Sequence, residues 1–284
     1  MILVTDCAAD LQQDEIKDIG AVIAPLYIQF PEGEISSDQI SPDEFYNRLE
    51  EMRPLIPSTA QPSPGIFSEM YNKLSETSRE IISIHISSGL SGTLNSARMG
   101  ASQAAKAVVH LFDSQTLSGG ERFQVLVAAK AIRAGWSSDK ILERLNLLRE
   151  QTEVIYTLDT LEYLARGGRI GRVQAIAGML LHLKPVIHVD HSDGKYSTVG
   201  KTRTIRKALE TIADYLANKY ENQALRVSVL HGRFSDQADA LAELLRERLN
   251  ASQMEILRIS PVLGVHTGPG IVGVAVAPSI LLDI

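Results

Sequence analysis

Short β-branched runs alternate with helical stretches through the first half of the chain, and no other feature of the sequence restricts the fold as strongly. Residues 80–86 form such a run, residues 87–93 form a Gly/Ser loop, and residues 94–106 form an alanine-rich stretch with helical character. Residues 108–112 then begin the next strand. Neighbouring parallel strands need a long crossover, usually a helix, so this order is typical of βα units. It predicts an α/β fold with a Rossmann-like parallel sheet in the first half.

The second half of the chain follows a different pattern. Residues 186–189 and 196–200 are strand-like and flank a turn at residues 191–194, which predicts a β-hairpin and hence a mixed sheet. The length of 284 residues is close to two domains of about 150 residues each. We therefore expect residues 1–152 to form a Rossmann-like α/β domain and residues 153–284 to form a second α/β domain with a mixed sheet.

Charge and cysteine content argue against several classes of function. The chain has 28 Lys and Arg residues against 34 Asp and Glu residues, so its net charge of −6 gives no global attraction to nucleic acid. Cys7 is the single cysteine, which leaves no disulfide and no thiolate cluster. The seven histidines show no metal-ligand spacing. We expect no nucleic-acid partner, no metal and a cytoplasmic location.

One stretch is long enough to cross a membrane. Residues 259–282 contain no Asp, Glu, Lys or Arg, and about 20 apolar residues span a bilayer. Three prolines and four glycines interrupt this stretch, and a spanning helix would need its freed backbone groups satisfied at each break. A strand, a loop and a second strand fit the same residues. We therefore expect no stable membrane insertion, and we expect His266 to lie in the loop between the two strands.

Two polar loops have the composition of anion-binding segments. Residues 87–93 lie between a strand and a helix, where backbone N–H groups and hydroxyls meet a helix N-terminus that favours negative charge. The loop lacks the Lys of a P-loop, and the order around Ser91 misses the nucleophile elbow by one place. Residues 57–64 carry three prolines and several hydroxyls, which predicts a rigid loop. A plain turn with a Ser or Thr cap explains residues 87–93 equally well. For residues 57–64, a solvated connector whose hydroxyls initiate turns is the favoured interpretation.

Basic residues gather in two further segments. Arg166, Arg169 and Arg172 stand among three glycines, and Arg203 belongs to a second basic run at residues 201–207. Guanidinium groups recognise carboxylates and phosphates through paired N–H donors. A solvated loop and an exposed helical face are the alternative interpretations. Spacing assigns no partner base to Cys7, which favours a packing role for this residue.

Taken in order along the chain, seven segments resemble the DegV family of bacterial fatty-acid-binding proteins. They include Ser-Ser-Gly-Leu-Ser-Gly-Thr at residues 87–93 and His-Thr-Gly-Pro-Gly at residues 266–270. The full set is residues 5–11, 58–63, 87–93, 113–114, 161–170, 184–185 and 266–270. Each motif alone is weak, but seven in register cover almost the whole chain. The resemblance implies the DegV-like (EDD) fold, in which a Rossmann-like domain joins a second α/β domain that encloses an acyl chain.

The resemblance also implies a lipid-binding function and a set of site residues. One long-chain fatty acid would be buried, with its carboxylate held by Thr59, Ser91 and His266. Arg166, Arg169, Arg172 and Arg203 would lie near this site or on a surface that faces a separate fatty acid kinase. The chain would then have no catalytic residue and no cofactor of its own, and would present its ligand for phosphorylation. Two departures from the family pattern are Cys7, where a serine is usual, and Ala60, where a second loop hydroxyl is usual.

Elementary energetics agree with such a ligand. An acyl chain of about sixteen carbons buries some fifteen methylenes at roughly 0.8 kcal/mol each, and the buried carboxylate then needs hydrogen-bond donors. We expect an apolar helix at residues 175–183 and the strand at residues 186–189 to line the tail. The alternative function is an enzyme acting on a small anionic substrate, either a phosphotransferase-related protein or a hydrolase that uses Ser91. A regulatory module without a ligand is a third possibility.

Overall fold

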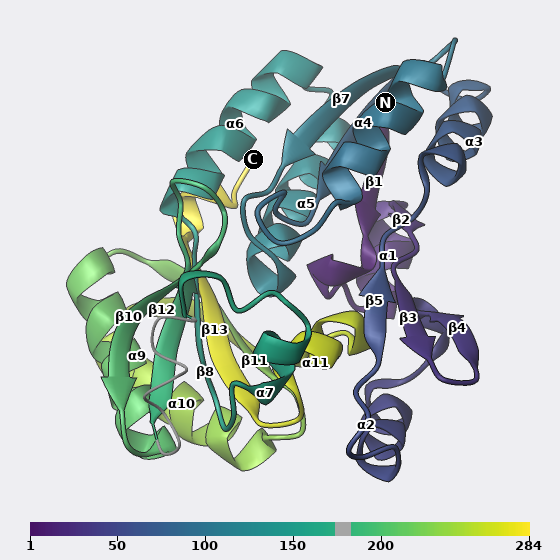
Figure 1. The fold of residues 1–284 in the computed structure, drawn as a ribbon. Coiled ribbons are helices and arrows are strands. Elements are labelled where there is room, and N and C mark those ends of the chain that lie inside the picture. The colour runs from purple at the N-terminus through teal and green to yellow at the C-terminus, as the bar shows by residue number, and fades with distance from the viewer. Residues whose placement is uncertain (174–182) are drawn as a thin grey trace.

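A four-stranded parallel sheet forms the centre of the first half of the chain (Figure 1). The computed structural model describes residues 1–173 and 183–284. The strand order is β2-β1-β6-β7, and all three pairings are parallel, which confirms the predicted parallel sheet. The strands are β1 (Ile2–Asp6), β2 (Val22–Ala24), β6 (Glu80–His85) and β7 (Val108–Asp113).

Helices cover both faces of the parallel sheet. Two of them, α3 (Pro64–Ser75) and α4 (Thr93–Gln103), pack on one face, where Phe67, Tyr71 and Ala97 are buried. On the other face lie α5 (Ser118–Arg133) and α6 (Ser138–Gln151). The helix α1 (Gln13–Ile19) contacts α5. Short 3-10 turns occupy Cys7–Ala9, Ser37–Gln39, Gly171–Val173 and Ser279–Leu281.

A small antiparallel sheet corrects one sequence-based expectation. It has the order β4-β3-β5 and consists of β3 (Tyr27–Phe30), β4 (Gly33–Ser36) and β5 (Ser58–Ala60). The helix α2 (Pro42–Glu51) lies between β4 and β5 along the chain. Residues 57–64 were expected to be loop throughout, yet β5 pairs with β3. The three prolines of this segment stand outside the ladder, so they do not interrupt its hydrogen bonds.

The second half of the chain contains a six-stranded mixed sheet of order β10-β9-β8-β13-β11-β12. The antiparallel pair β9–β10 confirms the predicted hairpin, whereas β11 and β12 are parallel. The chain is therefore an α/β protein with one parallel and one mixed sheet. The strands are β8 (Glu153–Leu158), β9 (Lys184–Val189), β10 (Tyr196–Thr202), β11 (Leu225–His231), β12 (Ala251–Arg258) and β13 (Ile271–Pro278).

The mixed sheet is covered differently on its two faces. Two amphipathic helices, α9 (Ile205–Tyr220) and α10 (Ser235–Arg248), pack on one face (Figure 1). The opposite face contacts α5, so one hydrophobic core extends from Leu3 in the parallel sheet to Ala275 in the mixed sheet. A Cβ atom on Gly119 would lie 2.7 Å from the Ala275 Cβ atom, which shows how closely α5 approaches β13. The division at residue 152 stays a prediction.

Buried ion pairs connect these layers. Arg122 on α5 is only 2% exposed, and it pairs with Glu15 on α1 and Glu255 on β12. Glu153, fully buried at the start of β8, accepts from His188 at 2.9 Å and pairs with Lys219. A buried charge is tolerated where such partners satisfy it. The two networks therefore hold α1 and α5 against β12, and α9 against β8.

The uncharged stretch near the C-terminus forms a short helix and a strand. Residues Pro261–Thr267 form α11, so His266 is helical, and its predicted position in a loop is wrong. Pro261 stands at the first turn, where its missing N–H costs nothing, and Gly268 ends the helix with a φ of 71°. Among the described residues, no helix has both the length and the apolarity needed to cross a bilayer.

Candidate functional site

Four separate segments of the chain meet at one polar pocket. Three of the predicted site residues line it, namely Thr59 on β5, Ser91 before α4 and His266 on α11. Arg169, in the loop after α7 (Glu162–Arg166), lines it as well. The pocket has about 520 Å³ of empty space, including the part open to solvent. Its other lining residues are Leu26, Ala60, Gln61, Ile86, Leu90, Tyr196, Val262 and Leu263.

Thr59 and His266 are in direct contact. The Thr59 Oγ1 atom lies 2.8 Å from the His266 Nε2 atom, although the residues are 207 positions apart. Pairing of Thr59 with Ile28 in β3 fixes the threonine. Burial, together with the smaller effect of the positive charge of Arg169, lowers the pKa of His266 to about 4. The imidazole is therefore neutral at pH 7 and can donate one hydrogen bond.

Two glycines explain why the arginine-rich segment lies against this histidine. A Cβ atom on Gly167 would clash with the His266 Nδ1 atom. A Cβ atom on Gly268 would clash with the ring of Tyr163 on α7. Close approach of backbone to side chain is a common reason for glycine at such positions. The glycines therefore let the loop after α7 pack against the end of α11.

Arg169 differs from its neighbours in its contacts. Its Nη1 atom donates to the Gly167 carbonyl oxygen at 2.7 Å, and the side chain is half-buried. Arg166 and Arg172 pair with carboxylates, whereas none lies within ion-pair distance of Arg169 in the parts of the chain that the structure describes. A partly desolvated guanidinium beside a neutral histidine favours an anionic ligand.

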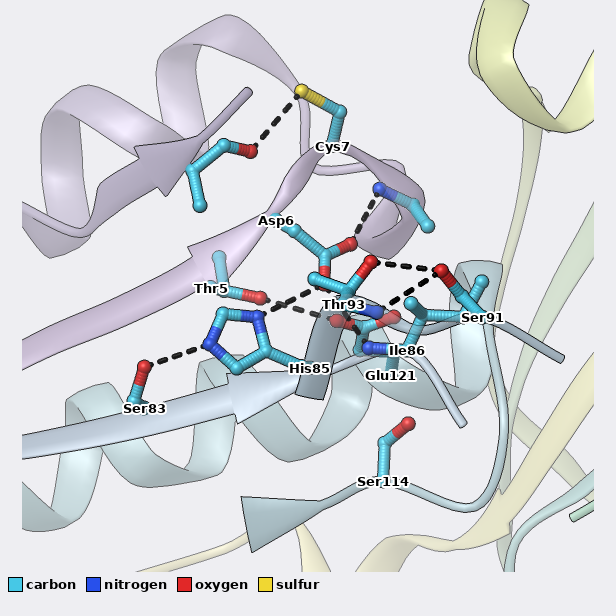
Figure 2. A network of polar contacts seen from close by, with 12 residues as sticks. Thr5, Asp6, Cys7, Ser83, His85, Ile86, Ser91, Thr93, Ser114 and Glu121 are labelled. Atoms are coloured by element: carbon cyan, nitrogen blue, oxygen red, sulfur yellow. Dashed lines mark hydrogen bonds and ion pairs between the residues drawn. The ribbon is translucent and has the colours of Figure 1, made fainter. Parts of the chain in front are cut away.

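Ser91 belongs to the turn that begins α4. Its Oγ atom lies 2.8 Å from the Thr93 Oγ1 atom and accepts from the Thr93 N–H at 3.3 Å (Figure 2). No histidine contacts Ser91 among the described residues, so its hydroxyl lacks the adjacent base of a hydrolytic serine. The hydroxyl can still contact a ligand, because Ser91 lines the pocket.

Behind Ser91, a buried network fixes the carboxyl ends of β1 and β6 (Figure 2). The Asp6 carboxylate accepts from the Ala8 and Ile86 N–H groups and contacts His85 Nδ1 at 3.0 Å. His85 Nε2 in turn lies 2.8 Å from the Ser83 hydroxyl.

Burial raises the pKa of the Cys7 thiol to about 12. Cys7 is therefore protonated at pH 7, as its predicted packing role requires.

An apolar cavity adjoins the polar pocket. Tyr196 and Leu263 line both spaces. Its walls come from α5, β8, β11, β13 and α11, and include Val154, Tyr156, Leu230, Ile259 and Ile271. None of residues 186–189 lines this cavity, and Ile187 and Val189 pack in the core, so a role of that strand in lining the tail stays a prediction. The other expected wall, residues 175–183, lies outside the described residues except for Leu183.

The remaining predicted arginines do not line the pocket. Arg166 is exposed and pairs with Glu162 at 2.8 Å, and it donates to the Pro54 carbonyl oxygen at 2.7 Å. Arg172 pairs with Asp190 and Asp193, each at 3.0 Å. Arg203 is exposed between β10 and α9. A partner-facing role for these three residues stays a prediction.

Sequence analysis missed two pocket residues. Gln61 follows Thr59 by two positions and lies against the position of Gly92, where a Cβ atom would come within 3.1 Å of its Nε2 atom. Tyr196 starts β10 and connects the two spaces. Gln61 stood within the polar loop already noted, whereas nothing in the local sequence marks Tyr196.

Comparison with known proteins shows the family of this chain. The model of an uncharacterised protein family named DegV matches residues 1–279. The chain belongs to the DegV family. This DegV-family chain is 36% identical over 280 residues to a DegV domain-containing protein of Clostridium perfringens, with 98% of each chain covered.

Solved structures share the fold of this DegV-family chain. One shows fatty acid binding of a DegV family protein from Thermus thermophilus. It has 33% identity and a TM-score of 0.91 over 98% of this chain and 99% of that one. Another is a stearic acid-binding protein from Eubacterium ventriosum, with 25% identity and a TM-score of 0.86 over 98% of each chain. The architecture of two sheets is thus that of known DegV structures.

Proposed function

We propose that the chain binds one long-chain fatty acid, with the carboxylate in the polar pocket and the tail in the adjoining apolar cavity. The observation that carries this proposal is that a polar space and an apolar space adjoin, with Tyr196 and Leu263 lining both. One space offers hydroxyls, an imidazole and a guanidinium, and the other is almost entirely apolar. Fatty acid binding in the Thermus thermophilus and Eubacterium ventriosum structures supports the same ligand class.

The donors match the needs of a carboxylate. Thr59 and Ser91 supply hydroxyls, and neutral His266 orients the Thr59 hydroxyl by donating its Nε2–H to the threonine oxygen. Arg169 supplies a positive charge that no carboxylate neutralises in the described structure. A carboxylate oxygen can accept a hydrogen bond from Thr59 once the His266 Nε2–H bonds the threonine oxygen. Together these donors offset the several kcal/mol that an unpaired buried carboxylate costs.

We infer further that the chain presents the fatty acid to a separate kinase and performs no turnover itself. The head-group end borders Gln61 and Gly92, which are both exposed, so a partner could reach the carboxylate. Exposed Arg166 on α7, which pairs with Glu162, could contact an acidic partner surface. In this proposal the protein works in the cytoplasm, where the kinase and its nucleotide are present.

One contact favours the alternative of an enzyme. A Thr59 hydroxyl 2.8 Å from a histidine nitrogen resembles a nucleophile with its base. In a catalytic triad a third group orients the base, but the buried His266 Nδ1 atom has no hydrogen-bond partner among the described residues. Labelling of the chain by a fluorophosphonate probe, lost in Thr59→Val or Ser91→Ala, would support the enzyme instead.

A titration of delipidated protein with palmitate or oleate tests the proposed site. Thr59→Val, Ser91→Ala and His266→Ala are each expected to weaken binding by roughly 5- to 30-fold, because each removes one hydrogen bond worth about 1 to 2 kcal/mol. Ser102→Ala, which removes an exposed hydroxyl that bonds the Met99 carbonyl on α4, is the matched control. Unchanged affinity in all three pocket variants would refute the assignment of the carboxylate site.

A further inference from the structure

A polar side chain at the exposed edge of the polar pocket has no partner within the protein. Gln61 lines the pocket and is exposed, and its amide makes no hydrogen bond among the described residues. Thr59, Ser91 and Arg169, which line the same pocket, each contact a protein group. An amide offers two N–H donors and one carbonyl acceptor. The donors of Gln61 are therefore available to a ligand.

The backbone places Gln61 on the same side as Thr59. Thr59 and Ala60 belong to β5, which pairs with β3, and Gln61 follows directly. Residues two positions apart along a strand point to the same side, and both side chains line the pocket. Pro62 restricts the backbone of the residue before it to extended conformations. The backbone of Gln61 is therefore fixed at the pocket, while its side chain can still rotate.

Gly92, just before α4, leaves room for the Gln61 amide. A Cβ atom on Gly92 would come within 3.1 Å of the Gln61 Nε2 atom and 3.4 Å of its Cδ atom. Ser91 immediately precedes Gly92 and lines the pocket. The amide thus reaches across the edge of the pocket, from the segment that carries Thr59 to the turn that carries Ser91.

A carboxylate in this pocket needs several donors. Its two oxygens together offer about four lone-pair positions. Thr59 and Ser91 can each donate one hydrogen bond, and Arg169 offers a charged donor. On the exposed side of the pocket, water would otherwise fill a remaining position, and an N–H group of Gln61 can take its place.

We propose, resting on the proposed fatty acid function, that Gln61 is a specificity-determining residue that donates its Nε2–H group to the ligand carboxylate. The amide is neutral, so it favours an anionic head group without adding a charge of its own. A carboxylate at the same position would repel the ligand. Gln61 thus helps the pocket to select a free, ionised fatty acid over an acyl chain with a neutral head group.

Titration of delipidated protein with palmitate tests this proposal through two substitutions of the same residue. Gln61→Met keeps the length of the side chain and removes its donors, so palmitate affinity is expected to fall about 3- to 15-fold. Gln61→Glu keeps the shape and adds a negative charge, so the affinity is expected to fall roughly tenfold further. Gln61 is exposed, so neither change is expected to disturb the fold.

Two controls separate this contact from a general effect of charge. Gln103→Glu adds the same charge at the exposed end of α4, outside both spaces, and is expected to change palmitate affinity by less than about twofold. Hexadecanol has no charge, so its affinity is expected to agree within about twofold between Gln61→Met and Gln61→Glu.

The outcomes distinguish this inference from the proposed function. Palmitate affinity of Gln61→Met within about twofold of the wild type, or equal losses in Gln61→Met and Gln61→Glu, overturns the inference alone. A loss in Gln103→Glu as large as that in Gln61→Glu does the same. Failure of the wild type to bind palmitate or oleate overturns the proposed function with it.

Discussion

Replacing Arg169 by glutamine tests the electrostatics of the polar pocket through two separate readouts. The substitution removes the positive charge that lines the pocket beside His266 and keeps a side chain of similar reach. Hydrogen bonds to charged groups contribute about 1.5 to 3 kcal/mol. Loss of one such bond to a carboxylate predicts roughly 10- to 150-fold weaker fatty acid binding.

The second readout is the titration of His266. Burial is the main cause of its low pKa and the charge of Arg169 is the second, so Arg169→Gln leaves the burial and removes the repulsion. The pKa of His266 is therefore expected to rise from about 4 toward, but not to, the usual 6.5. An NMR titration of the histidine ring protons in delipidated protein measures this change.

The two readouts together separate binding from mere proximity. Arg206→Gln, which changes an arginine with a 91% exposed side chain on α9, is expected to alter neither quantity. If Arg169→Gln raises the pKa of His266 but changes fatty acid affinity by less than twofold, Arg169 lies beside the histidine without contacting the carboxylate. That result would refute the assignment of Arg169 to the ligand.

Three further predictions concern packing and pH. Arg122→Met is expected to lower the free energy of unfolding by about 3 kcal/mol in urea, because Glu15 loses its ion pair and Glu255 keeps only Arg226 and Ser228 as partners. A loss below about 1 kcal/mol would contradict this. Burial opposes ionisation of Glu153, but His188, His191 and Lys219 hold its pKa well below the usual 4.5. The stabilising contribution of ionised Glu153 is therefore full above pH 4.5 and is lost as the pH falls below that value. Glu153→Gln should be less stable than the wild type at pH 7, and its stability should fall less steeply with acidification. An unchanged dependence of stability on pH would exclude this role. Gly167→Ala is expected to displace His266 and to weaken fatty acid binding by roughly tenfold with little loss of the fold. Gly65→Ala, whose added Cβ atom would make only an ordinary contact at 3.6 Å, should change neither the position of His266 nor the affinity. Equal binding by both variants would show that the close packing of Gly167 is unimportant.

Local patterns were sufficient for the parallel sheet and for the hairpin of the mixed sheet. The run at residues 80–86 followed by a Gly/Ser loop predicts β6 and the start of α4, because a strand period and a helix period are both readable over short windows. The hairpin β9–β10 follows from its turn residues. In the pocket, Thr59, Ser91 and His266 were found through the family resemblance, and the structure brings all three together.

Tertiary contacts decided what the sequence did not show. The pairing of β5 with β3 depends on a strand about 30 positions away, and no local signal reports it. His266 was expected in a loop because glycines surround it, yet residues 261–267 are helical and packed on α7 and α2. Among four similar arginines, only the fold reveals that Arg169 alone faces the pocket while Arg172 pairs with two aspartates.

The walls of the tail cavity were the hardest feature to predict. Val154 and Tyr156 alternate along β8 as any buried strand residues do, and Leu230 and Ile271 come from two other strands. A side chain that lines a ligand cavity and one that closes a core have the same composition. The sequence therefore predicts how much apolar surface is buried but not which part of it faces a ligand.

The most direct test of fatty acid binding is lipid mass spectrometry of the purified chain. Native spectra before and after extraction with organic solvent would show whether an acyl chain is bound and in what ratio, and the extract would identify it. We predict one long-chain fatty acid per chain, or stoichiometric uptake of one by protein that was delipidated. A chain that carries no acyl group and takes up neither palmitate nor oleate would contradict the proposed function.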